Sequence, residues 1–244
     1  MTLRLNCDLG EGFGSWTMGM DAAAMPHIDQ ANIACGFHAG DPLIMRKTLQ
    51  LAKEHGVTPG AHPAYPDLVG FGRRSMNCSH DEIVAFVQYQ VAAIDGIAQS
   101  LGIELKYVKP HGALYNDMMA KPDVRHAVMT AISGYHRPLD LMLLATQQAD
   151  EHLAEAATFN LTLQFEAFAD RCYMDDGKLT PRSMDIAVHT REKMLAQVAQ
   201  LNSKGTVTTN TGKEIPVRAD TLCVHGDNAE GVAAIAEIRA LIHS

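Results

Sequence analysis

The chain has 244 residues, of which 47% are hydrophobic and 20% are charged, and these proportions are typical of soluble globular proteins rather than disordered chains. Its 28 acidic residues outnumber its 20 basic residues, which gives a formal charge of -8. This balance argues against nucleic acid or an anionic membrane as a partner, because both carry negative charge.

The start of the chain has a strand-like pattern over residues 3–7 rather than the pattern of a secretory signal. No stretch approaches the roughly 20 consecutive apolar residues of a membrane span. The five cysteines include no CxxC pair, so neither a disulfide framework nor a cysteine zinc site is indicated. We therefore expect a cytoplasmic protein with reduced thiols.

Apolar runs of strand length alternate with amphipathic stretches of helix length, which is the pattern of βαβ units in a parallel sheet. The seven predicted strands cover residues 3–7, 30–35, 57–61, 105–108, 139–145, 162–166 and 221–224. An α/β barrel commonly reaches this length as one unit. We expect one domain over residues 1–244.

Several of the intervening helices have recognisable start signals. Asp41 followed by Pro42 predicts a capped helix that runs to Gly56. Ser79 and Glu82 form a capping box before a helix that extends to residue 100. The inward stripe of this second helix is predicted to consist of Ile83, Val87, Val91 and Ile94. Further helices are predicted from 121–123 onward and over 147–157, 183–201 (with Ile186, Met194, Leu195 and Val198 inward) and 228–242.

Two segments do not fit the alternation. Residues 63–77 contain the sequence Gly-Phe-Gly-Arg-Arg and are too long for a simple connector, so we expect an active-site loop. Residues 206–218 alternate around Asn210-Thr211-Gly212, which predicts a β-hairpin inserted before the last strand.

Polar side chains follow the ends of six of the predicted strands. An α/β enzyme assembles its site in this way from segments that are distant in sequence. The clusters begin at or just after the strands and contain Asn6, Asp8 and Glu11; His38; His62; Lys109 and His111; Glu166, Asp170 and Arg171; and His225 with Asp227. We expect one shared pocket.

The first clusters offer acid, base and metal chemistry. Asp8 and Glu11 are paired acids that suit a general base or a metal ligand; the alternative is that they accept backbone hydrogen bonds in a turn or cap a helix. His38 and His62 with Asp8 form a candidate divalent-metal set. A core or capping role for each histidine remains open.

Lys109 and His111 form the sharpest single cluster. A lysine ammonium at a strand end can hold a carboxylate or phosphate, and the histidine can move a proton near neutral pH. Arg73, Arg74 and Arg171 lie in or beside loops where guanidinium groups would bind an anionic substrate, although ordinary loop salt bridges explain any one of them equally well.

Standard nucleotide and hydrolase motifs are absent from the sequence. Residues 205–213 superficially resemble a P-loop, but Glu214 stands where a Ser or Thr is required. No GxGxxG follows the first strand, and no GxSxG elbow occurs. The chain therefore has no standard phosphate cradle.

The polar clusters together resemble the LamB/YcsF family, over nearly the whole chain and in family order. The matching stretches are NCDLGE at 6–11, ANIACGFHAGD at 31–41, GAHP at 60–63, GFGRR at 70–74, VKPHGALY at 108–115, EAFADRCY at 166–173 and VHGD at 224–227.

This resemblance implies a distorted seven-stranded (β/α) barrel of the glycoside hydrolase/deacetylase type and a role as the A subunit of an ATP-dependent 5-oxoprolinase. Such an enzyme opens the lactam of 5-oxo-L-proline to L-glutamate, with ATP as cosubstrate, Mg²⁺ accompanying the ATP, and two further subunits, B and C, as partners. We expect Asp8, His38, His62, Lys109 and His111 to be catalytic, with Asp8 or a histidine as the base. The expected substrate-binding residues are Asn6, Glu11, Arg73, Arg74, Glu166, Asp170, Arg171 and His225.

One departure separates this sequence from the sugar deacetylases. Those enzymes pair two adjacent aspartates with an HxxxH motif, whereas here Cys7 precedes Asp8 and Pro42 stands four residues after His38. Whether a transition metal binds is left open. The alternatives are a metal-dependent deacetylase or amidohydrolase that acts without ATP, and a non-catalytic subunit that binds the substrate.

Overall fold

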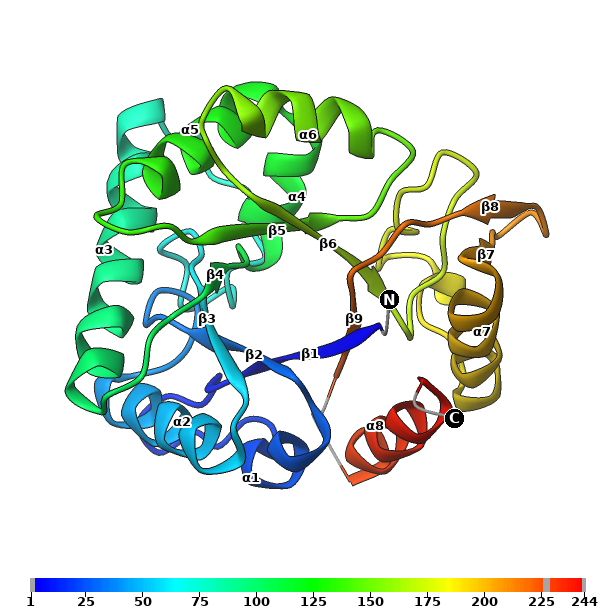
Figure 1. Ribbon diagram of the computed structural model, residues 1–244, viewed down its shortest axis with the longest axis horizontal. Coiled ribbons are helices and arrows are strands. Elements are labelled where there is room, and N and C mark those ends of the chain that lie inside the picture. The colour runs from blue at the N-terminus through cyan, green and yellow to red at the C-terminus, as the bar shows by residue number, and fades with distance from the viewer. Residues whose placement is uncertain (1–2, 226–228, 243–244) are drawn as a thin grey trace.

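Seven parallel strands form a closed barrel in the computed structural model, which describes residues 3–225 and 229–242. The strand order is β1-β2-β3-β4-β5-β6-β9, and β9 pairs with both β1 and β6 to close the ring (Figure 1). The strands are β1 (Arg4–Leu9), β2 (Gln30–Ala34), β3 (Thr58–His62), β4 (Tyr107–Val108), β5 (Asp140–Leu144), β6 (Leu163–Phe168) and β9 (Thr221–Val224). All seven predicted strands are confirmed, with ends shifted by up to two residues.

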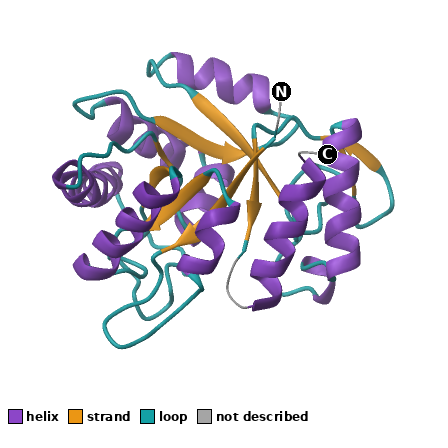
Figure 2. Ribbon diagram, turned by 60° about the horizontal axis from the view of Figure 1, so that its bottom comes forward, coloured by secondary structure: helices purple, strands orange, loops and turns teal. Residues whose placement is uncertain are grey.

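Helices surround the barrel on the outside (Figures 1 and 2). They are α1 (Asp21–Ala24), the 3-10 helix η1 (Met25–His27), α2 (Pro42–His55), α3 (His80–Ser100), α4 (Gly112–Ala120), α5 (Pro122–Ser133), α6 (Ala149–Ala157), the 3-10 helix η2 (Asp185–Ala187), α7 (Arg191–Lys204) and α8 (Ala229–Ile242). This arrangement confirms the α/β barrel fold class. The single-domain expectation stays a prediction.

The predicted helix signals act as expected. The Asp41 carboxylate accepts from the backbone N–H groups of Leu43 and Ile44, and α2 ends where Gly56 adopts a left-handed conformation. Ser79 and Glu82 form a complete capping box at the start of α3. The stripe of Ile83, Val87, Val91 and Ile94 is buried against the barrel. Local capping and periodicity therefore position these two helices.

A two-stranded antiparallel sheet of β7 (Thr206–Thr208) and β8 (Glu214–Pro216) lies between α7 and β9 in the chain. It confirms the predicted hairpin, and it stands apart from the barrel strands beside α7 (Figure 1).

The prediction of one helix over 183–201 is wrong at its start. Thr190 is the N-cap residue of α7, and the preceding residues form only the short helix η2. The side chain of Ile186, predicted to face inward, is 48% exposed. Helix α4 was not predicted, because it starts immediately after the polar Lys109–His111 cluster without a separate turn. The expected helix start at Asn228 lies outside the described residues.

The barrel interior is lined partly by hydrogen-bonded polar side chains rather than by aliphatic layers alone. Gln30 donates to Gln164 (2.8 Å), and Asn6 donates to Thr221 (3.1 Å). Nearer the site, the Tyr107 hydroxyl donates to Asn32 Oδ1 (2.7 Å). All of these side chains are buried, so their mutual hydrogen bonds reduce the penalty of burying polar groups and fix the positions of the side chains.

Gly60 makes room for the Tyr107 ring. A Cβ atom on Gly60 would lie 2.3 Å from that ring, so we expect Gly60→Ala to lower the free energy of unfolding by about 1–3 kcal/mol through overpacking. Urea denaturation measures the change. Gly96→Ala is the matched control, because nothing lies within 4 Å of a Cβ there and the substitution favours helix α3. Equal denaturation midpoints for the Gly60 variant and the native chain would contradict this account.

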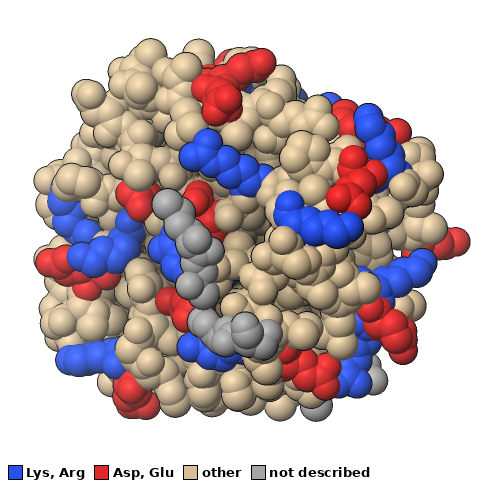
Figure 3. All heavy atoms as spheres, turned by 45° about the vertical axis from the view of Figure 1, so that its right-hand side comes forward, with Lys and Arg blue, Asp and Glu red and all other residues tan. Residues whose placement is uncertain are grey.

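No helix among the described residues is long and apolar enough to cross a membrane. On the face of the molecule in Figure 3, basic and acidic side chains are interspersed rather than segregated.

Candidate active site

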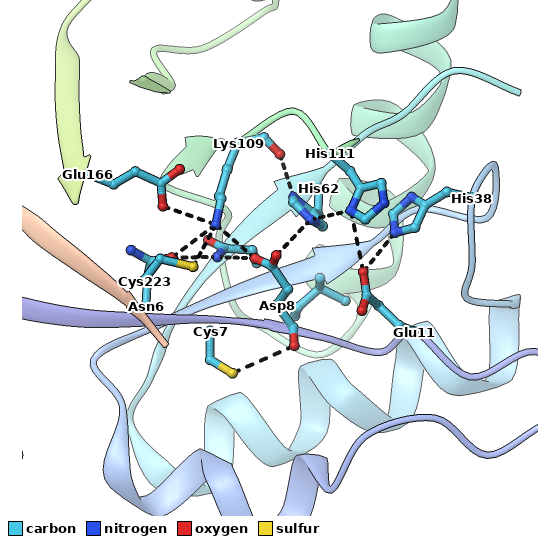
Figure 4. Close-up of polar contacts among 12 residues, drawn as sticks. Asn6, Cys7, Asp8, Glu11, His38, His62, Lys109, His111, Glu166 and Cys223 are labelled. Carbon is cyan, nitrogen blue, oxygen red and sulfur yellow. Dashed lines mark hydrogen bonds and ion pairs between the residues drawn. The ribbon is translucent and has the colours of Figure 1, made fainter. Parts of the chain in front are cut away.

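The polar side chains predicted from the strand ends meet around a cavity of about 590 Å³. Asp8 lies one residue before the end of β1, and His62 is the last residue of β3. Lys109 and His111 follow the end of β4. These four residues line the cavity together with Glu11, Phe71, Arg73, Tyr115, Phe168, Arg171, Arg182 and His225, among others. Figure 4 shows side chains from separate elements pointing toward one another. The carboxyl end of the barrel thus provides one shared pocket.

Lys109 is the centre of a buried ion-pair network. Its ammonium donates to Asp8 Oδ1 at 2.9 Å, to Asn6 Oδ1 at 3.2 Å and to Cys223 Sγ at 3.3 Å, which accounts for the three N–H donors of a lysine. Glu166 Oε2 also lies 3.0 Å away as an ion-pair partner. Burial alone would lower the pKa of Lys109, but Asp8, Cys223 and Glu166 hold it well above its usual value. Lys109 therefore neutralises and orients the protein's own carboxylates, and it has no spare donor for a substrate anion.

Asp8 has one engaged oxygen and one oxygen that faces the histidines. Oδ1 accepts from Lys109 and from Asn32 Nδ2 (2.7 Å), while Oδ2 lies 3.4 Å from His62 Nε2. Burial would raise the pKa of Asp8, but the charges of His62 and Lys109 together hold it well below its ordinary value. Asp8 is therefore an ionised carboxylate at neutral pH, with Oδ2 directed toward the pocket.

His62 and His111 are each fixed by a backbone carbonyl. His62 Nδ1 lies 2.6 Å from the carbonyl oxygen of Lys109, and His111 Nε2 lies 2.9 Å from that of Phe71. A carbonyl oxygen only accepts, so each of these ring nitrogens carries a proton. The two remaining nitrogens, His62 Nε2 and His111 Nδ1, then face each other at 3.0 Å.

Glu11 and His38 complete this histidine cluster. His38 Nε2 lies 3.1 Å from Glu11 Oε1, and the His38 ring stacks on that of His111 with centroids 3.7 Å apart. The pKa of Glu11 is raised mainly by burial and to a smaller extent by the negative charge of Asp8. The pKa values of His38 and His111 lie well below the usual value, mainly because both rings are buried and to a smaller extent because of the neighbouring imidazoles.

The predicted metal set of Asp8, His38 and His62 is divided between two groups. Among the described residues, His38 and His62 share a group with Glu11 and His111 in which all donor atoms lie within 4.8 Å of one another. Asp8 belongs to a second group, with Cys223 and His225. Metal binding itself stays a prediction.

The loop over residues 63–77 covers the histidine cluster. Its Phe71 and Arg73 line the cavity, and the Arg73 guanidinium lies 5.0 Å from the centroid of the Phe71 ring. Gly72 has a φ of +63°, and a Cβ there would lie 2.8 Å from both His38 and His111. Only glycine fits this position without strain. Arg74, by contrast, does not line the cavity but pairs with Asp67.

The remaining predicted residues lie on the β6 and β9 side. His225 Nδ1 lies 3.0 Å from Asp170 Oδ2. Burial alone would lower the pKa of His225, but Asp170 raises it, so the two form an ion pair at the cavity wall. Arg171 lines the cavity, yet it donates to the carbonyl oxygens of Ala187 (3.1 Å) and Thr180 (2.7 Å) and holds the loop. The predicted Asp227 lies outside the described residues.

Comparison with known proteins gives the same family as the sequence motifs. The model of the LamB/YcsF family matches residues 3–244. The chain belongs to the LamB/YcsF family. It is 53% identical to a protein from Vibrio cholerae that is named as the A subunit of 5-oxoprolinase, over 99% of this chain and 98% of that one. A protein of the same name from Pseudomonas fluorescens is 52% identical, over 99% and 97% of the two chains.

A solved structure agrees with the fold. The lactam utilization protein from Thermus thermophilus is 37% identical and superimposes with a TM-score of 0.91, covering 100% of this chain and 96% of that one.

Sequence reasoning missed several supporting residues of this LamB/YcsF chain. Asn32 donates to Asp8 and accepts from Tyr107, and these hydrogen bonds fix the Asp8 carboxylate. Tyr115 is a second such residue, and burial together with the Glu166 carboxyl group raises its pKa. Asn32 gave a usable signal, because a polar amide within an apolar strand requires buried partners. Tyr115 gave no signal of its own, because it stands at the end of the VKPHGALY stretch beside the more reactive Lys109 and His111.

Proposed function

We propose that this chain is the A subunit of a 5-oxoprolinase and takes part in opening the lactam of 5-oxo-L-proline to L-glutamate. The observation that carries the proposal is the 53% identity, over 99% of this chain, to a protein of that name. A pocket of about 590 Å³ lined by carboxylates, histidines and arginines suits a small anionic amide.

We further propose that the reaction is coupled to ATP hydrolysis in a complex with two other subunits, B and C, with Mg²⁺ accompanying the ATP. A five-membered lactam is a resonance-stabilised amide whose ring reforms readily, so hydrolysis gains from activation by phosphoryl transfer to the amide oxygen. Water then attacks the activated carbonyl carbon, phosphate leaves, and cleavage of the ring C–N bond with protonation of the nitrogen gives L-glutamate. ATP as cosubstrate would place the complex in the cytoplasm.

Asp8 is our candidate for the base that takes a proton from the attacking water. It is ionised, it lines the cavity, and its Oδ2 is directed toward the pocket. Lys109 and Asn32 hold the other oxygen, which fixes the orientation of the carboxylate. Lys109, with its ammonium already paired, acts on the reaction through Asp8.

The substrate carboxylate requires a cation that is not already paired. Arg73 and Arg182 line the same cavity, and an exposed guanidinium there can bind a carboxylate with two hydrogen bonds.

Replacement of Arg182 by glutamine is expected to raise KM for 5-oxoproline about 10- to 150-fold, because a charge-assisted hydrogen bond contributes roughly 1.5–3 kcal/mol. Steady-state kinetics of the assembled complex measures the change, with Arg46→Gln on the surface of α2 as the control. A KM equal to that of the native complex would remove Arg182 from the substrate site.

The deciding experiment for the proposed function measures glutamate released from 5-oxoproline, with and without ATP, by this chain alone and by its mixture with candidate B and C subunits. We expect release only from the mixture with ATP. Full activity of the partner subunits in the absence of this chain would contradict the catalytic role and support a protein that only binds substrate.

A second function, that of a metal-dependent amidohydrolase acting without ATP, is favoured by one observation: three histidines and Glu11 form a cluster with metal-ligand spacing. Glutamate release by the isolated chain with added metal and no ATP would support that function instead.

A further inference from the structure

Two imidazole nitrogens face each other in the pocket with at most one proton to share. His62 and His111 each donate their other ring N–H to a backbone carbonyl, at 2.6 and 2.9 Å. The facing nitrogens, His62 Nε2 and His111 Nδ1, are 3.0 Å apart. In neutral rings both carry lone pairs directed at the same point, which is unfavourable without a proton or a cation between them.

The surrounding donor atoms have the spacing of a metal coordination shell. Metal–nitrogen bonds of roughly 2.0–2.1 Å in a tetrahedral site separate neighbouring donor atoms by about 3.3 Å. Besides the 3.0 Å between the two imidazoles, Glu11 Oε1 lies 3.5 Å from His111 Nδ1 and 3.1 Å from His38 Nε2. These separations match three edges of such a shell, and all four donor atoms lie within 4.8 Å of one another.

The groups behind the donors are those that metal sites use. Metal-binding histidines usually donate their second N–H to a carbonyl or carboxylate, which fixes the tautomer, and His62 and His111 both do so. The three histidines are at most 5% exposed. His38 Nε2 and His111 Nδ1 both face Glu11 Oε1 (Figure 4).

We propose that Glu11, His38, His62 and His111 bind one divalent first-row transition-metal cation. Imidazole and carboxylate ligands suit zinc and its neighbours better than magnesium or calcium, which prefer oxygen ligands. This donor set keeps His38 and His62 from the sequence prediction and replaces Asp8 with Glu11 and His111. Asp8 then lies beside the metal ligand His62 and remains paired with Lys109. The site is independent of ATP coupling and of the identity of the substrate.

The test is direct metal binding to the chelator-treated chain, without any activity measurement. Titration with Zn²⁺ by calorimetry is expected to show one equivalent bound, and Co²⁺ is expected to give the visible absorption of a site of low coordination number. Glu11→Gln and His111→Ala should each weaken Zn²⁺ binding by more than about 100-fold, because loss of a ligand exceeds the roughly 10- to 100-fold effect of losing an outer partner. Bound metal should also raise Tm of the native chain but not of these variants.

Two control variants make the result specific. His80→Ala removes an exposed histidine outside the pocket and should bind Zn²⁺ as the native chain does. Cys223→Ser changes the second group, formed with Asp8 and His225, and should also leave binding intact. The proposal is overturned if the native chain shows no saturable binding and nitrogen NMR finds a proton shared by His62 and His111. It is equally overturned if Cys223→Ser, and not Glu11→Gln, abolishes binding.

Discussion

Replacing Lys109 by methionine is expected to lower the free energy of unfolding by about 3–5 kcal/mol, the range found when one partner of a buried ion pair is removed. Lys109 is 2% exposed, and its ammonium lies within 3.0 Å of an oxygen of both Asp8 and Glu166. Methionine fills most of the space but leaves both carboxyl groups in the barrel without a cation. Glu166 is fully buried, and burial already raises its pKa.

Chemical denaturation of native and variant chains measures this effect. Lys106→Met is the matched control, because Lys106 pairs with Glu104 at the surface and exposed pairs contribute little. Equal losses of stability in the two variants would contradict the role given to Lys109. A double variant, Lys109→Met with Glu166→Gln, should recover part of the loss, since one of the two unpaired carboxylates is then neutral.

The pH dependence of this difference follows from the directions of the pKa shifts. The pKa of Lys109 is raised by folding, so its stabilisation is fully present below its unfolded pKa of about 10.4 and is lost as the pH rises through the folded value. The pKa of Asp8 is lowered, so its stabilisation is present above about pH 3.9 and is lost as the pH falls through the folded value. The difference in unfolding free energy between the native chain and Lys109→Met should therefore be constant near neutral pH and shrink in both strong acid and strong base.

The barrel was predictable because its signals are local. Each strand is an apolar run bounded by polar or turn residues, and helices α2 and α3 begin at caps that can be read directly, Asp41 and Ser79. The error at 183–201 arose because Ile186 fits the helical spacing of Met194 and Val198, although it lies in the short helix η2 and is 48% exposed. A short apolar stretch can match helical periodicity without being buried.

The meeting of the strand-end residues was also predictable, because the carboxyl ends of parallel strands lie at the same end of a barrel. The pairing among them was not. His38 lies against Glu11 rather than Asp8, and Lys109 is enclosed by Asp8 and Glu166. These pairings depend on the paths of the loops after β1 and β2 and on side-chain rotamers. The pattern of strands in the sequence predicts neither.

The Asp8→Asn variant is expected to lower kcat of the assembled enzyme about 10²- to 10⁴-fold, the contribution of a positioned general base. Asparagine keeps an oxygen that can accept from Lys109 and Asn32, as Asp8 Oδ1 does. It replaces the outward Oδ2, 3.4 Å from His62 Nε2, with an amide that cannot take a proton. KM should change much less than kcat, because the proposed carboxylate contact is to arginine.

Asp81→Asn on the surface of α3 is the control for this variant, since the Asp81 side chain is fully exposed. Circular dichroism and Tm separate lost chemistry from lost structure: a variant that unfolds at a lower temperature but keeps native kcat when folded would show a structural role alone. Full coupled activity of Asp8→Asn would remove Asp8 as the base.

The pH profile adds a readout that a structural role would not change. His62 and Lys109 hold the pKa of Asp8 well below its ordinary value, so the carboxylate stays ionised throughout the range in which the enzyme is assayed. Any acid limb of kcat/KM near pH 5–7 must then come from another group, and histidine is the side chain that ordinarily titrates there. Lys109→Met removes the ammonium beside Asp8 and should move the Asp8 pKa upward. We expect a new acid limb in the kcat/KM profile of Lys109→Met that is absent from the native enzyme and from Lys106→Met. This limb would show that the Lys109 ammonium sets the pKa of Asp8, the proposed base. An unchanged profile would mean that the proton leaves by a route that does not pass through Asp8.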